Sequence, residues 1–232
     1  MKDEEKSVIM ATPIPHQFEA IQSASFQKFY RGNPTRKEVA FTFDDGPHKG
    51  ITEQLLAVLK QYNVKATFFV VGKKAEQSPE LVKTEFADGH CIANHTYHHD
   101  RLVALSKTTL ATEIDSCSDV INKITGKRPQ FFRPPGGTMD VLVTNMAQEL
   151  GYRTVLWSIN SGDFERPGKR VIINRVMKCV SNGSIILFHD GVQQTIDALP
   201  EIITTLRGQG YEFVTIDDMV SEYPDGVRTA KK

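Results

Sequence analysis

Short apolar runs alternate with longer segments of helical periodicity along most of the chain. The runs are nearly continuous, as in Val-Ala-Phe-Thr-Phe at 39–43, which is typical of strands that a parallel sheet buries on both faces. Seven strands are expected, at 39–43, 66–71, 91–94, 130–132, 153–157, 184–188 and 212–216. Helices are expected between them, at 52–62, 79–89, 107–124, 140–150, 171–180 and 193–206. The alternation predicts right-handed β-α-β units and therefore an α/β fold.

The carboxyl ends of five of these strands are followed by polar side chains. They are Asp44, Asp45, His95, His99, Arg133, Asp163 and His189. The alternation alone fits an open doubly wound sheet as well as a barrel. In a barrel, however, all strand ends share one face, where side chains from distant strands converge. We therefore expect a distorted TIM-like barrel of seven or eight β/α units.

The hydrophobic texture changes near residue 38, and this change sets the expected domain boundaries. Residues 1–37 show little periodicity and contain several prolines, so they are expected to be a lead-in segment. Residues 38–222 have the size of a single barrel domain, and residues 223–232 are expected to be a polar tail.

Composition and charge exclude several classes of protein. Lys+Arg and Asp+Glu are balanced at 28 each, so the basic surface that nucleic-acid binding requires is not expected. The sequence has no run of about 18 apolar residues, so no transmembrane helix is expected. The acidic N-terminal stretch lacks the apolar core of a signal peptide. Nothing in the sequence indicates an oligomeric state.

Two histidines and one carboxylate have the chemistry of metal ligands. Asp45 lies in the Asp-Asp-Gly-Pro segment 44–47, which also fits an ordinary turn. His95 and His99 are four residues apart, a spacing that puts both rings on one face if the segment forms a helical turn. His98 is a rival ligand, because a spacing of three does the same. Two imidazoles and a carboxylate suit zinc, iron, cobalt or nickel and leave positions open for water and substrate.

Polar residues after later strands could complete a catalytic site. Arg133 begins an Arg-Pro-Pro-Gly-Gly segment, either a rigid loop or a means of holding a carboxylate by paired hydrogen bonds. His189 lies two residues after Leu187 and so faces the same side of its strand, as a core histidine or a functional one. Asp163 is the carboxylate best placed to orient His189 or to pair with Arg133.

These motifs together resemble the polysaccharide deacetylases of carbohydrate esterase family 4, the NodB-homology domain. The resemblance covers about residues 38–219. It is carried by Thr-Phe-Asp-Asp-Gly at 42–46, His-Thr-x-x-His at 95–99, Arg-Pro-Pro-Gly at 133–136 and Leu-Phe-His at 187–189. It implies a distorted β/α barrel and hydrolysis of N-acetyl groups from a polysaccharide such as chitin or peptidoglycan. It also implies one divalent metal, usually zinc, with cobalt or nickel as substitutes.

The resemblance further implies roles for individual residues. Asp44 corresponds to the general base and Arg133 to its positioning partner. His189 corresponds to the general acid and Asp163 to the residue that tunes it. The implied metal ligands are Asp45, His95 and His99. The implied substrate-binding residues are Gly136 (through its backbone N–H), Leu187, Phe164 and Trp157.

Two departures from the family pattern concern the substrate pocket. The fourth motif usually reads Asp-x-x-Asp-Trp, whereas this chain has Asn160 at the first position and Phe164 at the last. Gly136 stands where many relatives carry tyrosine, so a more open pocket is expected.

Other functions remain open on the sequence alone. An O-acetyl xylan esterase belongs to the same family, and the altered fourth motif also fits a catalytically silent glycan-binding domain. A non-haem iron oxygenase would use the same two histidines and carboxylate. A serine esterase is disfavoured, because the sequence contains no Gly-x-Ser-x-Gly elbow. Family habit implies a secreted or cell-envelope protein.

Overall fold

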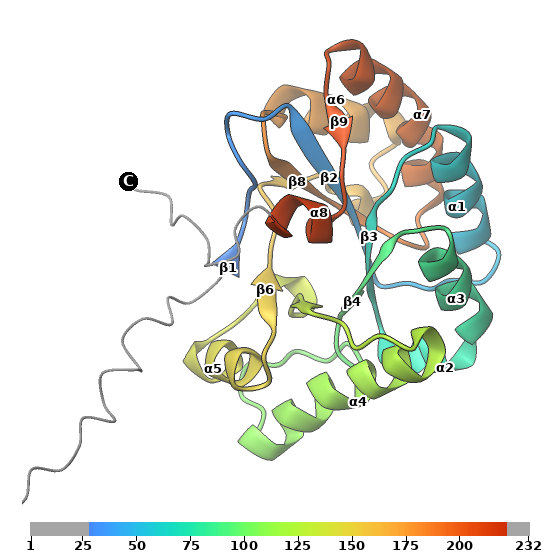
Figure 1. Ribbon diagram of the computed structural model, residues 1–232. Helices are drawn as coiled ribbons and strands as arrows, with labels where there is room; N and C mark the ends of the chain where they lie inside the picture. Colours follow the sequence, from blue (N-terminus) through green and yellow to red (C-terminus); the bar gives the residue numbers. More distant parts are fainter. Residues whose placement is uncertain (1–27, 222–232) are drawn as a thin grey trace, which may run out of the picture.

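A curled parallel sheet forms the centre of the computed structural model, which describes residues 28–221. The strands follow the order β1-β6-β5-β4-β3-β2-β8-β7, with β9 also paired to β2, and every strand pair is parallel. Figure 1 shows the sheet wrapped into a distorted barrel, which confirms the expected α/β barrel. The strands are β1 (Lys28–Phe29), β2 (Glu38–Asp44), β3 (Thr67–Val70), β4 (Cys91–Asn94), β5 (Phe131–Phe132), β6 (Arg153–Val155), β7 (Ile159–Asn160), β8 (Ser184–His189) and β9 (Glu212–Phe213).

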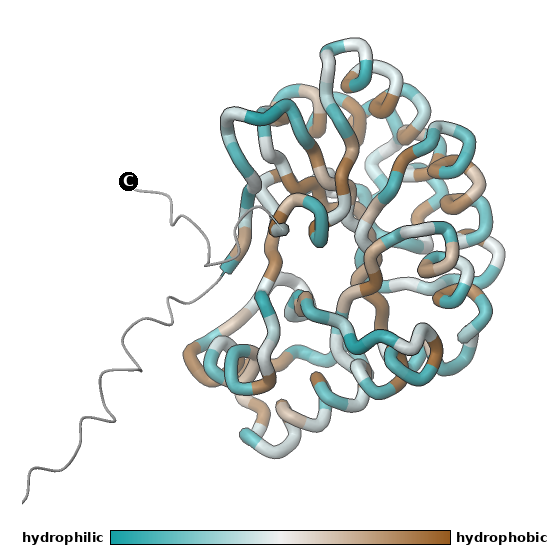
Figure 2. Tube along the Cα trace, in the orientation of Figure 1, coloured by the Kyte–Doolittle hydropathy of each residue, from teal (hydrophilic) through white to brown (hydrophobic). Residues whose placement is uncertain are grey.

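Helices surround the sheet on its outer side (Figure 1). They are α1 (Thr52–Gln61), α2 (Gly72–Gln77), α3 (Pro79–Ala87), α4 (Lys107–Thr125), α5 (Val141–Glu149), α6 (Lys169–Cys179) and α7 (Gln193–Gly208). A further short helix, α8 (Ile216–Ser221), packs instead against residues of the barrel interior. Figure 2 shows apolar residues along the strands and on the helix faces toward them, with hydrophilic residues outside. This is the pattern of a sheet buried by amphipathic helices.

The longest helix, α4, shows how local sequence sets element boundaries. The Ser106 side chain accepts a hydrogen bond from the Thr109 N–H at 3.1 Å, which caps the first turn. Gly126 ends the helix in a left-handed conformation with φ 73°, which costs glycine little.

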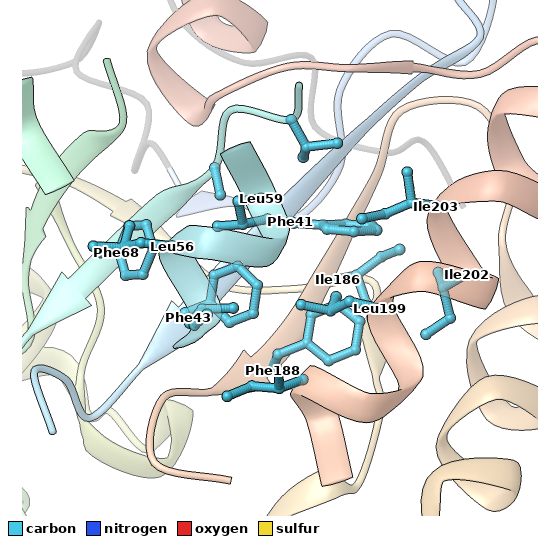
Figure 3. Close-up of a cluster of buried hydrophobic side chains, with 14 of the residues drawn as sticks. Phe41, Phe43, Leu56, Leu59, Phe68, Ile186, Phe188, Leu199, Ile202 and Ile203 are labelled. Carbon is cyan, nitrogen blue, oxygen red and sulfur yellow. The ribbon is translucent and has the colours of Figure 1, made fainter. Parts of the chain in front are cut away.

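The main core lies between strands β2 and β8 and helices α1 and α7 (Figure 3). Phe41, Phe43 and Phe188 are fully buried. The centroid of the Phe188 ring lies 5.3 Å from that of Phe41 and 5.6 Å from that of Phe43. Burying one such side chain stabilises a fold by roughly 1.5–3 kcal/mol. The core therefore fixes β2 against β8, the two strands that end at Asp44 and His189.

A second cluster fills the barrel interior, and α8 closes one end of it. Ile216 and Met219 of α8 pack with Phe29 and Phe69. The Ile216 N–H donates to the Thr67 hydroxyl at the amino end of β3. The carboxyl ends of the strands, where the candidate site lies, are thus at the opposite end from α8.

Sequence periodicity missed the shortest elements. Strands β1 and β7 have two residues each, and α2 has six, too few to show a period. The last expected strand, 212–216, is also shorter: β9 ends at Phe213, and Ile216 begins α8. Lys28 and Phe29 of the expected lead-in segment pair with β6.

Candidate functional site

Two adjacent carboxylates meet one imidazole where β2 ends. Neighbouring residues on a regular strand point to opposite faces, but Asp45 adopts φ 72° and turns the chain. The Nε2 atom of His95 consequently lies 3.6 Å from Asp44 Oδ2 and 3.4 Å from Asp45 Oδ1. The turn expected at the Asp-Asp-Gly-Pro segment exists, and it brings both carboxylates into one site.

Asp45, His95 and His99 form a group that could hold a metal ion. Their donor atoms lie within 4.8 Å of one another, with His99 Nε2 3.0 Å from Asp45 Oδ1. Asp45 Oδ1 is buried and accepts no hydrogen bond, an arrangement that a cation would relieve. Burial raises the pKa of Asp45, but the two imidazoles lower it by more, so the carboxyl is ionised. These donors fit a divalent metal.

The second nitrogen of His95 also suits metal binding. Its Nδ1 lies 2.7 Å from the backbone carbonyl of Arg133. Because a carbonyl only accepts hydrogen bonds, Nδ1 carries the proton and Nε2 keeps its lone pair toward Asp45. Metal-binding histidines are usually oriented in this way.

His95 and His99 converge through a loop, so the expected helical turn is wrong. Thr96 and His99 both adopt left-handed backbone conformations, each with φ 67°. The Asn94 side chain accepts the Thr96 N–H at 2.8 Å, and the Thr96 hydroxyl accepts the His99 N–H at 3.1 Å. Such side-chain-to-backbone bonds compete with a helix and here replace it.

Arg133 holds Asp44 from beneath the site. It is fully buried, and its Nη1 donates to Asp44 Oδ1 at 2.6 Å and to the Thr42 hydroxyl at 3.0 Å. Its Nε and Nη2 donate to the carbonyls of Val155 and Leu156. The expected paired hydrogen bonds to one carboxylate are wrong, because carbonyls at the end of β6 take the other donors. Burial lowers the pKa of Arg133, an effect that Asp44 opposes.

His189 and Asp163 form a second, largely buried pair. The His189 Nδ1–H donates to Asp163 Oδ1 at 2.7 Å, and the His189 backbone N–H donates to Oδ2 at 2.8 Å. The Thr195 hydroxyl donates to the same Oδ2. Burial lowers the pKa of His189, but the hydrogen bond and charge of Asp163 raise it above its ordinary value. Of the two partners expected for Asp163, the structure therefore shows His189.

The three predicted apolar residues differ in burial and in the residues they lie beside. Leu187 is buried, whereas Phe164 is 56% exposed and its ring lies edge-on to the His189 ring at 5.6 Å. Trp157 is half-buried above the guanidinium of Arg133, 5.5 Å from its centre. Phe164 and Trp157 thus each lie beside a catalytic candidate, and Leu187 precedes His189 by two residues on β8.

Gly136 is exposed in the loop after β5. Its φ is 62°, and a Cβ built there would meet only the Thr138 hydroxyl, at 3.8 Å. The space above Gly136 is therefore open, as expected from the departure at this position.

His98, the rival ligand, turns away from the group and pairs with Glu113 of α4.

Two other neighbours of the site gave no motif in the sequence. Thr195 of α7 supports Asp163, and Lys74 of α2 donates to the Asp45 carbonyl at 2.8 Å. Both lie on helices, where one polar side chain looks like part of the solvent-facing surface.

Known proteins are similar in sequence to this chain over most of its length. The profile of the polysaccharide deacetylase family matches residues 31–155. A peptidoglycan-N-acetylglucosamine deacetylase of Bacillus cereus is 41% identical over 189 residues, which are 79% of this chain and 88% of that protein. This chain belongs to the polysaccharide deacetylase family.

Solved structures of family members agree with this fold. A crystal structure of a peptidoglycan N-acetylglucosamine deacetylase superposes with a TM-score of 0.82 at 35% identity, covering 87% of this chain and 95% of that one. A Bacillus anthracis protein described as a pseudoenzyme of carbohydrate esterase family 4 has a TM-score of 0.81 at 28% identity, covering 84% and 69%. The fold is therefore shared by active and inactive family members.

Between residues 28 and 221, no helix combines the length and apolar character that a bilayer-spanning segment needs.

Proposed function

We propose that this chain is a metal-dependent hydrolase that removes N-acetyl groups from the amino sugars of peptidoglycan. Its named relatives act on peptidoglycan, and this supports the substrate class over chitin. The observation that carries the proposal is the metal-ligand group flanked by two largely buried pairs, Asp44–Arg133 and His189–Asp163. Because the proposed substrate is a polymer of the cell wall, the proposed location is the cell envelope. Residues 38–222 would form the catalytic domain.

Zinc is the metal we propose, with cobalt or nickel as substitutes. Asp45, His95 and His99 would hold it, leaving coordination positions open. When bound, the metal would supply Lewis acidity to the attacking water and to the acetyl carbonyl oxygen. The proposed proton transfers and the binding of substrate are carried out by the protein's own residues.

Asp44 is the proposed general base, and the structure supports one of its oxygens for the task. Arg133 occupies Oδ1, whereas Oδ2 faces the ligand group at 3.6 Å from His95 Nε2. We assign Oδ2 as the atom that takes the proton of the attacking water. The buried guanidinium of Arg133 holds Asp44 in place through its contact with Oδ1, so Oδ2 is the oxygen left facing the ligand group.

His189 is the proposed general acid. Its Nδ1–H is committed to Asp163, so Nε2 is the nitrogen that gives a proton to the departing amine. Amide hydrolysis needs this step because an amine leaves poorly as an anion, whereas the alkoxide from an O-acetyl ester needs it less. The raised pKa of His189 therefore favours N-deacetylation over O-deacetylation.

The remaining predicted residues would bind the substrate. Leu187, Phe164 and Trp157 supply apolar surface for the acetyl methyl and the sugar ring. The Gly136 N–H would donate to the oxyanion, a contribution that is worth on the order of 10²–10³ in rate elsewhere. The open space above Gly136 leaves room for a bulky sugar substituent.

The test is an acetate-release assay with defined metals. Its substrates are peptidoglycan containing N-acetylglucosamine or N-acetylmuramic acid, chito-oligosaccharides and O-acetylated xylan. We expect release from peptidoglycan with zinc or cobalt and loss of release in Asp44→Asn. Faster release from chito-oligosaccharides or xylan would overturn the substrate assignment.

A second candidate is a silent glycan-binding domain. It is favoured by the pseudoenzyme that shares this fold and by Asn160 and Phe164 in the altered fourth motif. Retention on insoluble peptidoglycan without acetate release from any substrate would establish it.

A further inference from the structure

Glu113 of α4 makes three hydrogen bonds to the loop that carries the histidine ligands. Its Oε2 accepts the His98 backbone N–H at 3.0 Å, and its Oε1 accepts the His98 Nδ1–H at 2.7 Å. Its backbone carbonyl accepts the Tyr97 N–H at 2.9 Å. The side chain is buried, with Glu113 only 6% exposed. One residue thus fixes two successive positions immediately before His99.

The loop needs such support, because its conformation is unfavourable by itself. Thr96 and His99 are both left-handed, which costs a residue with a Cβ atom roughly 1–2 kcal/mol each. Asn94 adds support at the start of the loop, since its side chain also binds the carbonyl of Ile114 in α4. The bonds to Glu113 are what hold the backbone of the following residues against α4.

His98, Asp100 and Glu113 also have donor atoms within 4.8 Å of one another, close enough to be a second cation site. The contacts argue against that function. Both carboxylate oxygens of Glu113 are already used by His98, at hydrogen-bonding distances. The arrangement is complete without an ion.

We propose that Glu113 is a positioning residue that orients His99 for metal binding by tethering the 95–99 loop to α4. The inference rests on the proposed metal site. It assigns a residue outside that site which neither touches substrate nor contacts the metal ligands through its side chain.

The test measures cobalt affinity in competition with a chelator, together with hydrogen exchange of the metal-free protein. In Glu113→Ala we expect cobalt affinity to fall about 10–100-fold, the usual effect of losing a residue that orients a ligand. The amides of Tyr97 and His98 should exchange faster, because both lose or loosen their acceptor. Affinity and exchange equal to those of the wild type would overturn the proposal.

Three further variants separate the tether from a general loosening of the loop or the fold. Glu113→Gln keeps the shape and one acceptor, so it should lose less affinity than Glu113→Ala and stay folded if alanine does not. Glu76→Ala is the matched control, because exposed Glu76 contacts the same loop through the Tyr97 hydroxyl. It should leave affinity unchanged. His98→Ala should weaken binding less than Glu113→Ala, since the backbone bond at residue 98 remains.

Metal stoichiometry and activity give the remaining outcomes. One cobalt per chain supports the tether, whereas a second cobalt that is lost in Glu113→Ala would overturn it in favour of a second cation site. Because cobalt binding requires no turnover, a chain that binds cobalt but releases no acetate would leave the tether standing and overturn the proposed function. A wild-type chain that binds no cobalt would overturn both.

Discussion

Asp44 and His189 are register partners on the neighbouring parallel strands β2 and β8. This pairing runs over six positions, from Val39 opposite Ser184 to Asp44 opposite His189. The proposed base and acid therefore stand at the same level of the barrel, at the ends of two strands locked together by the main core. Their separation is set by the sheet rather than by a mobile loop.

Asp44→Asn is expected to lower kcat for acetate release by roughly 10²–10⁴, the usual span for a general base. The asparagine oxygen can still accept from Arg133, so the fold should be retained while proton transfer is lost. Steady-state kinetics and thermal unfolding of the same sample check both statements. Near-normal turnover would exclude Asp44 as the base.

The pH profile of kcat tests the His189–Asp163 pair. Asp163 raises the pKa of His189, so the imidazolium that donates the proton persists to higher pH. Activity that needs this proton is present below the pKa and is lost as pH rises through it. Asp163→Asn removes the charge, so the alkaline limb of the profile should move to lower pH. A limb that stays in place would show that His189 is not the acid.

Metal removal should affect stability as well as activity. The ligands lie in two separate segments, so an ion bound to both would stabilise the folded state by about 2.7 kcal/mol when present at a hundred times its Kd. Calorimetry with and without a chelator should show a lower Tm after removal, and zinc or cobalt should restore it. The Asp45→Ala variant, which lacks the carboxylate ligand, should show no shift.

Glu85 of α3 is fully buried, and neither of its carboxylate oxygens has a hydrogen-bond partner. Burial raises its pKa well above the ordinary value, and the charge of Asp190 adds to the shift. The folded state keeps this proton, whereas the unfolded state releases it above about pH 4.3. The contribution of Glu85 to stability therefore falls as pH rises above that value.

Glu85→Met should consequently stabilise the protein, by about 1–3 kcal/mol for the unsatisfied group alone. The gain in free energy of unfolding, measured with urea, should be larger at pH 8 than at pH 4.5. An equal gain at both values would mean that Glu85 does not titrate on unfolding.

Gly137→Ala should displace the only tryptophan of the chain. A Cβ at residue 137 would lie 2.6 Å from the Trp157 ring, closer than atoms can approach. Gly136→Ala is the matched control, because φ is similar, 62° against 67°, but a Cβ there meets only Thr138 at 3.8 Å. Intrinsic fluorescence should change in the first variant and not in the second. The same shift in both would point to backbone strain rather than the ring.

Continuous apolar runs such as 39–43 predicted buried parallel strands, and the polar residues that follow five of these strands favoured a barrel over an open sheet. The local conformation of the candidate site was harder to predict from the sequence. The convergence of His95 and His99 was expected on a helical turn, whereas hydrogen bonds from Asn94 and Thr96 make a loop there. The spacing of the two histidines indicated that their side chains meet. The conformation of the loop between them depends on side-chain hydrogen bonds, which leave no periodic pattern in the sequence.

The position of Glu113 in the helical pattern was a sequence signal that an analysis of hydrophobic residues alone does not detect. It lies three residues after Leu110 and four before Cys117, both fully buried, so it occupies the apolar face of α4. A charged residue at such a position needs a partner. The partner, the His98 pair of donors, could not be identified until the loop was folded against the helix.

The position of α8 at one end of the barrel indicates how the protein can be immobilised. The helix closes the amino ends of the strands, so the last described residue, Ser221, leaves the barrel on the side away from the carboxylates and imidazoles. A solid support attached beyond that point would lie on the side opposite the candidate site. The site would then remain accessible to an insoluble polysaccharide. Immobilising the protein through its C-terminal side should therefore preserve turnover on intact sacculi.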